Sequence, residues 1–438
     1  MTDGPRSGRQ RPRLTATVTD VEVVRQRAYL VGVVTRDREA SASDGSLDEL
    51  GLLTETAGSE PVEATLVRRD RPDAALFIGK GKAAEIASST KALDIDVVVF
   101  DNELTPAQQR NLQNLFECDV VDRVAVILDI FAQHASSREG MLQVELAQHR
   151  YRLPRLRGRG IEMSRLGAGI NTRGPGETQL ETDRRRILDR VRKLETELQE
   201  LGRGRETRSK ARRRSKLSLV SLVGYTNAGK STLFNLLTGA DVLVEDQLFA
   251  TLDSTVRKVH MPGGHEILVS DTVGFVRRLP HQLVEAFRST LEQVNEADLM
   301  VHVVDASDPD PDQQITAVRT VLSEIGAADL PELIVVNKID AADPAAVDRL
   351  LALYPGAVAV SALTGEGRHR LEDAIFDRLA VGKVELDLLF PYDSGDALAT
   401  LHRVGEVTKT VHEDRGTLVH AKIPQHAAHR FSDFAIHG

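Results

Sequence analysis

The sequence has almost no cysteine and few aromatic residues. Of its 438 residues only Cys118 is a cysteine, none is tryptophan, and aromatic residues make up 4%. A single thiol excludes an intramolecular disulfide and any metal site built from several thiolates. We expect Cys118 to be a buried, unreactive side chain.

Long apolar runs are also missing. No stretch approaches the roughly 18 residues of a membrane-spanning helix, and the polar N-terminus MTDGPRSGRQRPRL lacks the apolar centre of a secretory signal. The composition, 41% hydrophobic and 28% charged, is that of a globular protein. We therefore expect a cytoplasmic protein with no membrane span. The length favours several domains over one core.

Basic residues are outnumbered by acidic residues overall but are concentrated in one segment. The net charge is −9, yet residues 150–216 hold 21 lysines and arginines against 9 acidic residues. This segment therefore carries +12 and the remainder −21. A local excess of this kind indicates one surface that faces a polyanion, although a charge run can also be a solvated face.

Strands alternating with helices predict an α/β chain. We divide it into a disordered tail (1–15), a small N-terminal α/β domain (16–135), a basic Gly/Arg-rich loop with a helical hairpin (136–216), a β/α series with a mostly parallel sheet flanked by helices (217–385), and a small β-containing C-terminal domain (386–438). In the last domain the pattern over 397–424 alternates like antiparallel strands around Asp414–Gly416.

The hairpin is predicted from two helical patterns. The first covers 124–150 throughout. The second begins at a capping box formed by Thr178 and Glu181 and has an apolar seam at heptad spacing, which would pair with the first helix: Ile187, Val191, Leu194, Leu198 and Leu201. The cluster ETRSKARRRSK (206–216) indicates an exposed hinge.

GYTNAGKS (224–231) lies between a strand pattern and the helical STLFNLL, which is the setting of a phosphate-binding P-loop. Glycines let backbone N–H groups approach phosphates, and the helix N-terminus adds its dipole. We expect Lys230 to bridge the β- and γ-phosphates and Ser231 to bind magnesium. The predicted nucleotide contacts here are Gly224, Tyr225, Thr226, Asn227, Ala228, Gly229, Lys230, Ser231 and Thr232.

DTVGF (271–275) follows the strand EILVS. Asp271 is expected in the second shell of the magnesium ion, and the Gly274 N–H is expected at the γ-phosphate. Thr272 and Val273 complete the predicted contacts of this motif. Phe275 takes the place in which Ras-like enzymes have a glutamine that orients the attacking water. Part of the catalytic apparatus must then lie elsewhere, and Phe275 can also serve as a packing residue.

Two further motifs indicate recognition of guanine. Asp340, at the end of NKID, can accept hydrogen bonds from guanine N1–H and N2–H₂, which adenine does not offer, and a site built on hydrogen bonds rejects such an analogue strongly. The backbone of SAL can meet guanine O6. The residues concerned are Asn337, Lys338, Ile339 and Asp340, then Ser361, Ala362 and Leu363. Four motifs in order, each after an apolar strand, predict a GTP-binding domain over 217–385.

GYTNAGKS, FATLD, DTVGF, NKID and SAL together resemble the HflX family of translational GTPases. The glycine-rich GPGETQLETDRRR, FIGKGK and DNELTPAQQRNLQ resemble this family too, so the likeness covers nearly the whole chain from about residue 20. In FATLDST either Thr251 or Thr255 could complete the magnesium site, and the family resemblance favours Thr251. The predicted contacts of FATLD are Phe249, Ala250, Thr251, Leu252 and Asp253.

The resemblance implies a cytoplasmic, partly ribosome-associated GTPase that binds the large ribosomal subunit and splits stalled or hibernating ribosomes under stress. It also implies slow intrinsic hydrolysis, with Lys230 and Gly274 as catalytic groups and stimulation by the ribosome. Arg277 and Arg278 could act in cis, or face solvent or RNA. Two alternatives stay open: an assembly GTPase of the large subunit, and a nucleotide-gated RNA-binding module. We expect a monomer when free.

Three smaller expectations concern ions and RNA. Asn227 either helps to hold a potassium ion beside the phosphates or stabilises its loop. The histidines show no metal-ligand spacing, so Mg²⁺ is the one divalent ion expected. GPGET could bind an anion at a capped helix, but it lacks a GK[ST] ending and is left unassigned. Candidate contacts to ribosomal RNA are Arg155, Arg157, Arg159, Arg165 and Arg173.

Overall fold

The computed structural model describes residues 17–19, 22–34, 40–156, 175–214, 217–239, 248–249, 255–261, 266–276, 292–381, 383–392, 394–424, 428, 431 and 434–436. They fall into two compact units, one containing the chain up to Glu197 together with Leu248 and Phe249, the other containing the rest from Leu198 onward. In the parts of the chain that are described, no helix has both the length and the apolarity to cross a bilayer.

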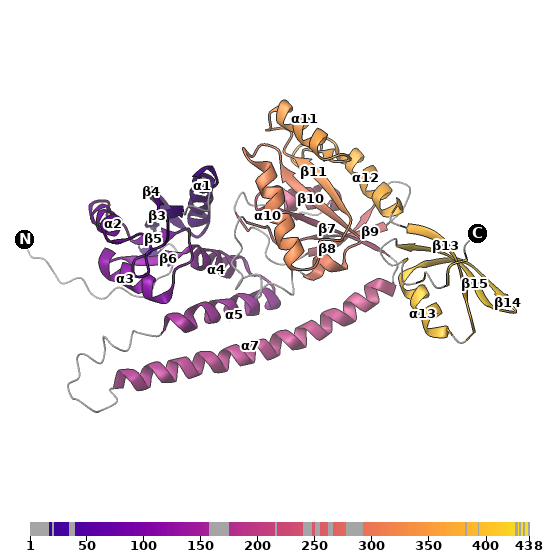
Figure 1. The fold of residues 1–438 in the computed structure, drawn as a ribbon, viewed down its shortest axis with the longest axis horizontal. Coiled ribbons are helices and arrows are strands. Elements are labelled where there is room, and N and C mark those ends of the chain that lie inside the picture. The colour runs from indigo at the N-terminus through magenta and orange to yellow at the C-terminus, as the bar shows by residue number, and fades with distance from the viewer. Residues whose placement is uncertain are drawn as a thin grey trace, which may run out of the picture. The chain divides into compact units, whose positions relative to one another are not determined.

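The N-terminal domain is a parallel sheet with helices on both faces (Figure 1). Its strands lie in the order β4-β3-β5-β6, and every neighbouring pair is parallel. The strands are β3 (Gln26–Val34), β4 (Ser59–Arg68), β5 (Val97–Phe100) and β6 (Asp119–Asp122). A short antiparallel pair, β1 (Thr17–Thr19) and β2 (Glu22–Val24), precedes them. The helices are α1 (Ala40–Thr56), α2 (Lys80–Ala92), α3 (Pro106–Phe116) and α4 (Arg123–His134).

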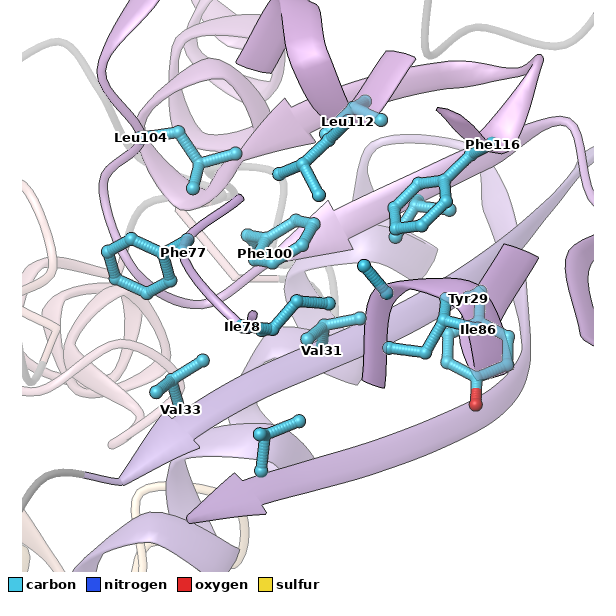
Figure 2. Close-up of a cluster of buried hydrophobic side chains, with 14 of the residues drawn as sticks. Tyr29, Val31, Val33, Phe77, Ile78, Ile86, Phe100, Leu104, Leu112 and Phe116 are labelled. Carbon is cyan, nitrogen blue, oxygen red and sulfur yellow. The ribbon is translucent and has the colours of Figure 1, made fainter. Parts of the chain in front are cut away.

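The core of this domain follows from strand alternation. Successive side chains of β3 point to opposite faces, and Tyr29, Val31 and Val33 pack in one cluster with residues of α2 and α3 (Figure 2). Phe77 and Phe100 meet edge to face, with ring centroids 6.4 Å apart. Cys118 is half-buried against the same cluster. On the other face, a Cβ added to Gly32 would lie 3.0 Å from Leu47 Cγ of α1.

The helical hairpin differs from the predicted one. The pattern over 124–150 is divided between α4 and α5 (Arg138–Arg155), because the Ser137 side chain accepts a hydrogen bond from the Gly140 N–H and caps a new helix. The second helix, α7 (Pro175–Arg214), starts before the predicted capping box, with proline in its first turn.

The same helix continues through the predicted hinge. Arginine, lysine and alanine are good helix formers, and residues 206–214 are helical. The predicted seam residue Leu194 is fully buried. Beside it Arg190 donates two hydrogen bonds to Glu145 of α5, at 2.7 and 2.6 Å. The hairpin is therefore formed by α5 and α7, and the exposed hinge was predicted wrongly.

The second α/β domain has a six-stranded sheet in the order β12-β11-β10-β7-β9-β8. The β8 strand is antiparallel to β9, and the other neighbours are parallel. Its strands are β7 (Ser218–Gly224), β8 (Thr255–His260), β9 (Glu266–Asp271), β10 (Leu299–Asp305), β11 (Glu332–Asn337) and β12 (Val358–Ala359). This confirms the predicted mostly parallel sheet flanked by helices.

The helices of this domain are α8 (Lys230–Thr238), α10 (Pro311–Glu324), α11 (Pro344–Leu353) and α12 (Arg368–Val381), with a short 3-10 helix, η2 (Glu292–Glu296). One cluster of buried residues joins Ile315 of α10 and Leu350 of α11 to Val336 of the sheet. The strands β7, β9, β10 and β11 are mostly buried, whereas β8 and β12 are not. The carboxyl ends of these four strands therefore form a firm support for the loops that follow.

The C-terminal domain contains an antiparallel sheet of β13 (Lys383–Phe390), β15 (Gly416–Pro424) and β14 (Glu406–Glu413), in that order, and the helix α13 (Gly395–Val404). The hairpin around Asp414–Gly416 is confirmed. The strand pattern predicted for 397–404 is wrong, since these residues are helical. Leu401 on this helix is fully buried in the domain core with Phe390 and Ile423.

Candidate functional site

The predicted nucleotide-binding motifs lie where parallel strands end. The loop 225–229 follows β7, Asp271 closes β9, Asn337 closes β11, and Ser361 follows β12. Because these strands are parallel, their carboxyl ends share one edge of the sheet, which is where open α/β sheets bind ligands. Motifs more than a hundred residues apart in the chain are thus brought to one place.

Two glycines allow the P-loop to approach the strands β10 and β11 closely. At Gly224 (φ 153°) an added Cβ would lie 2.3 Å from the Val303 carbonyl oxygen, and at Gly229 (φ 89°) it would lie 2.3 Å from Asn337 Nδ2. No side chain fits at either distance. Gly229 caps α8 without a side-chain hydrogen bond, so the first N–H groups of that helix are suited to an anion.

Lys230 is buried within the loop that it follows. Its side chain is 6% exposed, and Nζ donates a hydrogen bond to the Tyr225 carbonyl oxygen at 2.7 Å. Burial lowers the pKa of Lys230 to about 8, although the nearby Asp271 carboxylate opposes the shift. A phosphate group beside this ammonium would favour its charged form, which is what a β/γ-phosphate contact requires.

Ser231 and Asp271 come together across the site. The Ser231 hydroxyl donates to Asp271 Oδ2 at 2.8 Å, and the Thr272 N–H donates to Asp271 Oδ1 at 3.0 Å. The Thr272 hydroxyl donates to the Leu222 carbonyl at 2.6 Å, which fixes the turn after β9. A hydroxyl oxygen next to a carboxylate is the hard, oxygen-based donor set that Mg²⁺ prefers.

Phe275 joins the DTVG motif to the P-loop through its backbone. The Phe275 N–H donates to the Gly224 carbonyl at 3.1 Å, and the Phe275 carbonyl accepts from the Thr226 N–H at 2.7 Å. Its side chain is fully buried. Of the interpretations made from the sequence, the structure supports a packing role, and this side chain offers nothing that could orient a water molecule.

The motifs predicted to recognise guanine are joined by side-chain hydrogen bonds. Asn337 is 1% exposed; its Nδ2 donates to the Ala228 carbonyl at 2.8 Å, and its Oδ1 accepts from the Ala362 N–H at 2.9 Å. Asp340 is exposed and accepts from the Ser361 hydroxyl at 2.6 Å. Asn337 therefore connects the P-loop, the NKID loop and the SAL loop.

Two of the predicted nucleotide contacts, Lys338 and Leu363, have side chains in different surroundings. Lys338 Nζ lies 2.7 Å from Asp305 Oδ2. Asp305 was missed, although its place at the end of an apolar strand in the same domain was a usable signal. Leu363 is 78% exposed, so only its backbone is suited to a contact with the base. Ile339 and Thr232 are half-buried, and Val273 is buried.

Most of the FATLD motif lies outside the described residues, namely Ala250, Thr251, Leu252 and Asp253. Phe249 is described and buried, with a left-handed φ of 61°. Its ring meets that of Phe131 in α4 edge to face, with centroids 4.7 Å apart. Packing against a helix of the N-terminal domain was not predicted from the sequence, and it accounts for the burial of this side chain.

One candidate RNA contact requires correction. The Arg155 guanidinium is 13% exposed and pairs with Asp122 at 3.0 Å. It also donates to Gln109 Oε1 and to the Leu104 carbonyl, both at 2.9 Å, and lies over the Tyr151 ring. These contacts occupy it inside the N-terminal domain. The other four candidates, Arg157, Arg159, Arg165 and Arg173, lie outside the described residues.

A second set of basic residues was not singled out from the sequence. Five exposed cations lie on α7, three just before the first seam residue and two between seam positions, and their clustering as RRR and RK was the available signal. Arg186 and Arg192 have loose ion pairs, at 3.5 and 3.4 Å, with acidic residues of their own helix. The five residues are Arg184, Arg185, Arg186, Arg192 and Lys193.

Comparison with protein families gives three successive matches. Residues 44–132 match a model described as the N-terminal region of a GTP-binding GTPase, and residues 134–212 match its middle region. Residues 219–338 match a model described as a 50S ribosome-binding GTPase. The last match contains the P-loop, Asp271 and Asn337.

Relatives whose family is known match this chain along most of their own length and most of its length. The GTPase HflX of Lacrimispora saccharolytica is 45% identical over 405 residues, which cover 92% of this chain and 95% of the relative. The GTPase HflX of Escherichia coli is 42% identical over 396 residues, covering 90% and 92%. A solved GTP-binding protein of Sulfolobus solfataricus in complex with GDP is 25% identical, with a TM-score of 0.41, and the likeness covers 81% of this chain and 99% of that one.

The likeness to the curated relatives extends over nearly all of both chains. The chain therefore belongs to the HflX family of GTPases, enzymes that hydrolyse GTP to GDP and phosphate.

Proposed function

We propose that this GTPase binds the large ribosomal subunit and dissociates stalled or hibernating ribosomes under stress, with the ribosome stimulating its GTP hydrolysis. The observation that carries the proposal is the burial of Phe275. A site without a residue to orient water needs help from a partner, and a group delivered in trans can supply roughly 10³–10⁵ in rate. The description of the matched GTPase family, which names 50S binding, supports the ribosome as that partner.

The proposed site holds GTP through the P-loop, the DTVG motif, and the NKID and SAL loops. Ser231 is proposed as a direct ligand of Mg²⁺, with Asp271 behind it, because their oxygen atoms lie 2.8 Å apart. Thr251 remains the proposed third contributor. When bound, the ion supplies charge stabilisation at the transferring phosphoryl group. The role of the chain is to orient that group through Lys230 and the Gly274 N–H.

A monovalent ion is proposed beside Asn227. This residue is exposed and has a left-handed backbone, φ 59°, in the middle of the P-loop, so its side chain belongs to the turn that is proposed to hold the phosphates. We expect potassium to accelerate hydrolysis over sodium when ribosomes are absent. Steady-state phosphate release in matched potassium and sodium buffers measures this, and equal rates would contradict a potassium site.

We infer that the basic segment meets ribosomal RNA. The support is the charge of +12 over residues 150–216 and the exposed cations of α7. Arg157, Arg159, Arg165 and Arg173 remain candidates within it. We propose a cytoplasmic protein that is partly bound to ribosomes, and we propose separately that it is monomeric when free.

Light scattering of intact ribosomes tests the proposal. Full-length protein with GTP, or with a non-hydrolysable analogue, is expected to lower the scattering as subunits separate. If the analogue supports splitting, hydrolysis serves recycling of the factor. Binding to the large subunit without a fall in scattering would contradict the splitting role and favour a role in subunit assembly.

A further inference from the structure

The P-loop contains a buried hydroxyl group with no hydrogen-bond partner among the described residues. Thr226 is 5% exposed, and its Oγ1 is one of a few buried side-chain atoms there that make no hydrogen bond. Buried polar groups are nearly always paired, so such an exception calls for an explanation. Of these few atoms, Thr226 Oγ1 is the one located in the phosphate-binding loop.

The position of Thr226 is fixed from two sides. Its N–H donates to the Phe275 carbonyl at 2.7 Å. On the other side, a Cβ added to Gly274 would lie 2.7 Å from Thr226 Cγ2 and 3.2 Å from Lys230 Nζ. The Thr226 side chain, the Gly274 backbone and the Lys230 ammonium are therefore close neighbours.

These neighbours are the two groups proposed above to contact the γ-phosphate. The Thr226 atom nearest to Gly274 is the methyl carbon Cγ2, and the hydroxyl is carried by the same Cβ. A hydroxyl on this side chain would therefore lie near the oxygens that GTP has and GDP lacks. Hydrogen bonds from a hydroxyl to an anionic oxygen are about twice as strong as those between neutral groups. Valine would fill the same space without leaving a buried oxygen unpaired, so packing alone gives no reason for threonine.

We propose that the Thr226 hydroxyl donates a hydrogen bond to the γ-phosphate of GTP and thereby helps this GTPase to distinguish GTP from GDP. The inference rests on GTP binding by this domain and assigns the side chain a role that the P-loop pattern does not give it. Thr226 is a specificity residue, because the contact exists with the triphosphate and not with the diphosphate.

The test compares Thr226→Val, which removes the hydroxyl and keeps the shape, with Thr226→Ser, which keeps the hydroxyl. Dissociation constants of full-length protein for GDP and for a β,γ-imido analogue of GTP are measured with Mg²⁺ present. We expect Thr226→Val to weaken binding of the analogue by about ten- to a hundredfold and to leave GDP binding within about twofold. Thr226→Ser is expected to retain the preference of the parent for the analogue over GDP.

A second measurement separates this role from a structural one. Without nucleotide, Thr226→Val is expected to raise the Tm of the GTPase domain by about 2–4 °C, since it removes an unpaired buried oxygen. A lower Tm, an equal loss of both nucleotides, or an unchanged ratio of the two affinities would overturn the inference. A parent protein that bound neither nucleotide would instead overturn the GTP site itself.

Discussion

Lys230 shows how a side chain proposed to bind phosphate can reduce the stability of the fold that holds it. Burial disfavours its charged form and lowers its pKa from 10.5 to about 8. The unfolded chain binds the proton more tightly than the folded chain does. At pH 7, where both are protonated, this difference amounts to about 3 kcal/mol against folding.

We predict that Lys230→Met stabilises the nucleotide-free GTPase domain while it abolishes GTP binding. Methionine is flexible and of similar size, so it should fill the same space. The expected gain at pH 7 is about 1–3 kcal/mol, because the hydrogen bond to the Tyr225 carbonyl is lost at the same time. Urea unfolding of parent and variant without nucleotide measures the difference in the free energy of unfolding. The transition that belongs to the GTPase domain is identified in the parent as the one that GDP shifts.

The pH dependence of the stability difference between Lys230→Met and the parent shows whether burial of the ammonium causes it. Between pH 8 and 10.5 the folded parent releases its proton before the unfolded chain does, so the stability of the parent rises with pH over this window. The advantage of the variant should therefore be largest below about pH 8 and close towards pH 10.5. A gap that stayed constant with pH would show that burial of the ammonium is not its source.

At the scale of elements, the hairpin of α5 and α7 combines an apolar seam with ion pairs beside it. Leu194 is fully buried, whereas the side chains of Arg190 and Glu145 are 38% and 37% exposed. Hydrogen bonds from Arg190 hold the pKa of Glu145 below its usual value. Solvent nevertheless screens a pair as exposed as this one.

We predict that Leu194→Ala destabilises the hairpin by about 2–4 kcal/mol and Arg190→Ala by about 0.5–1 kcal/mol. The first substitution leaves a cavity, while the second removes a half-exposed ion pair. Chemical unfolding of the full-length variants, followed by circular dichroism, gives both values. An arginine substitution as costly as the leucine one would show that charge, rather than the seam, holds the two helices.

Motifs with local chemistry were readable from the sequence, and contacts between distant segments were not. The P-loop, DTVG and NKID could be found because each needs particular residues directly after a strand. The break at Ser137 was missed because the helical patterns before and after it were read as one, although the polar stretch HASSREG (134–140) contains the capping serine. Residues 206–214 were taken for a hinge because charge density was weighed above helix propensity. Arg155 illustrates the limit, since nothing near it in sequence reveals that Asp122 is its partner.

At the scale of the whole molecule, charge is distributed unevenly, and this should govern the proposed binding to the ribosome. A cationic helix face on a chain of net charge −9 gains affinity for RNA mainly by releasing counterions. Binding should therefore weaken steeply as salt rises. The exposed arginines of α7 are the described residues best placed to show this.

We predict that Arg185→Glu/Arg192→Glu weakens binding to the large subunit and makes it less sensitive to salt. Arg71→Glu/Arg370→Glu is the matched control, because it changes two other exposed arginines and alters the net charge equally. Sedimentation with large subunits at several potassium chloride concentrations provides affinity and slope. If both double variants lost affinity alike, overall charge would explain the loss, and the helix face would not.

The side-chain amide of Asn337 has a consequence for how the protein binds fragments of the nucleotide. It bonds the P-loop at one end and the SAL loop at the other, so neither loop can be displaced without disturbing its neighbour. Guanosine alone or pyrophosphate alone would each encounter loops already ordered by the same side chain. Binding of the intact nucleotide then requires no more ordering of the protein than binding of either fragment. The nucleotide is therefore expected to bind more tightly than the fragments because its two parts are covalently joined.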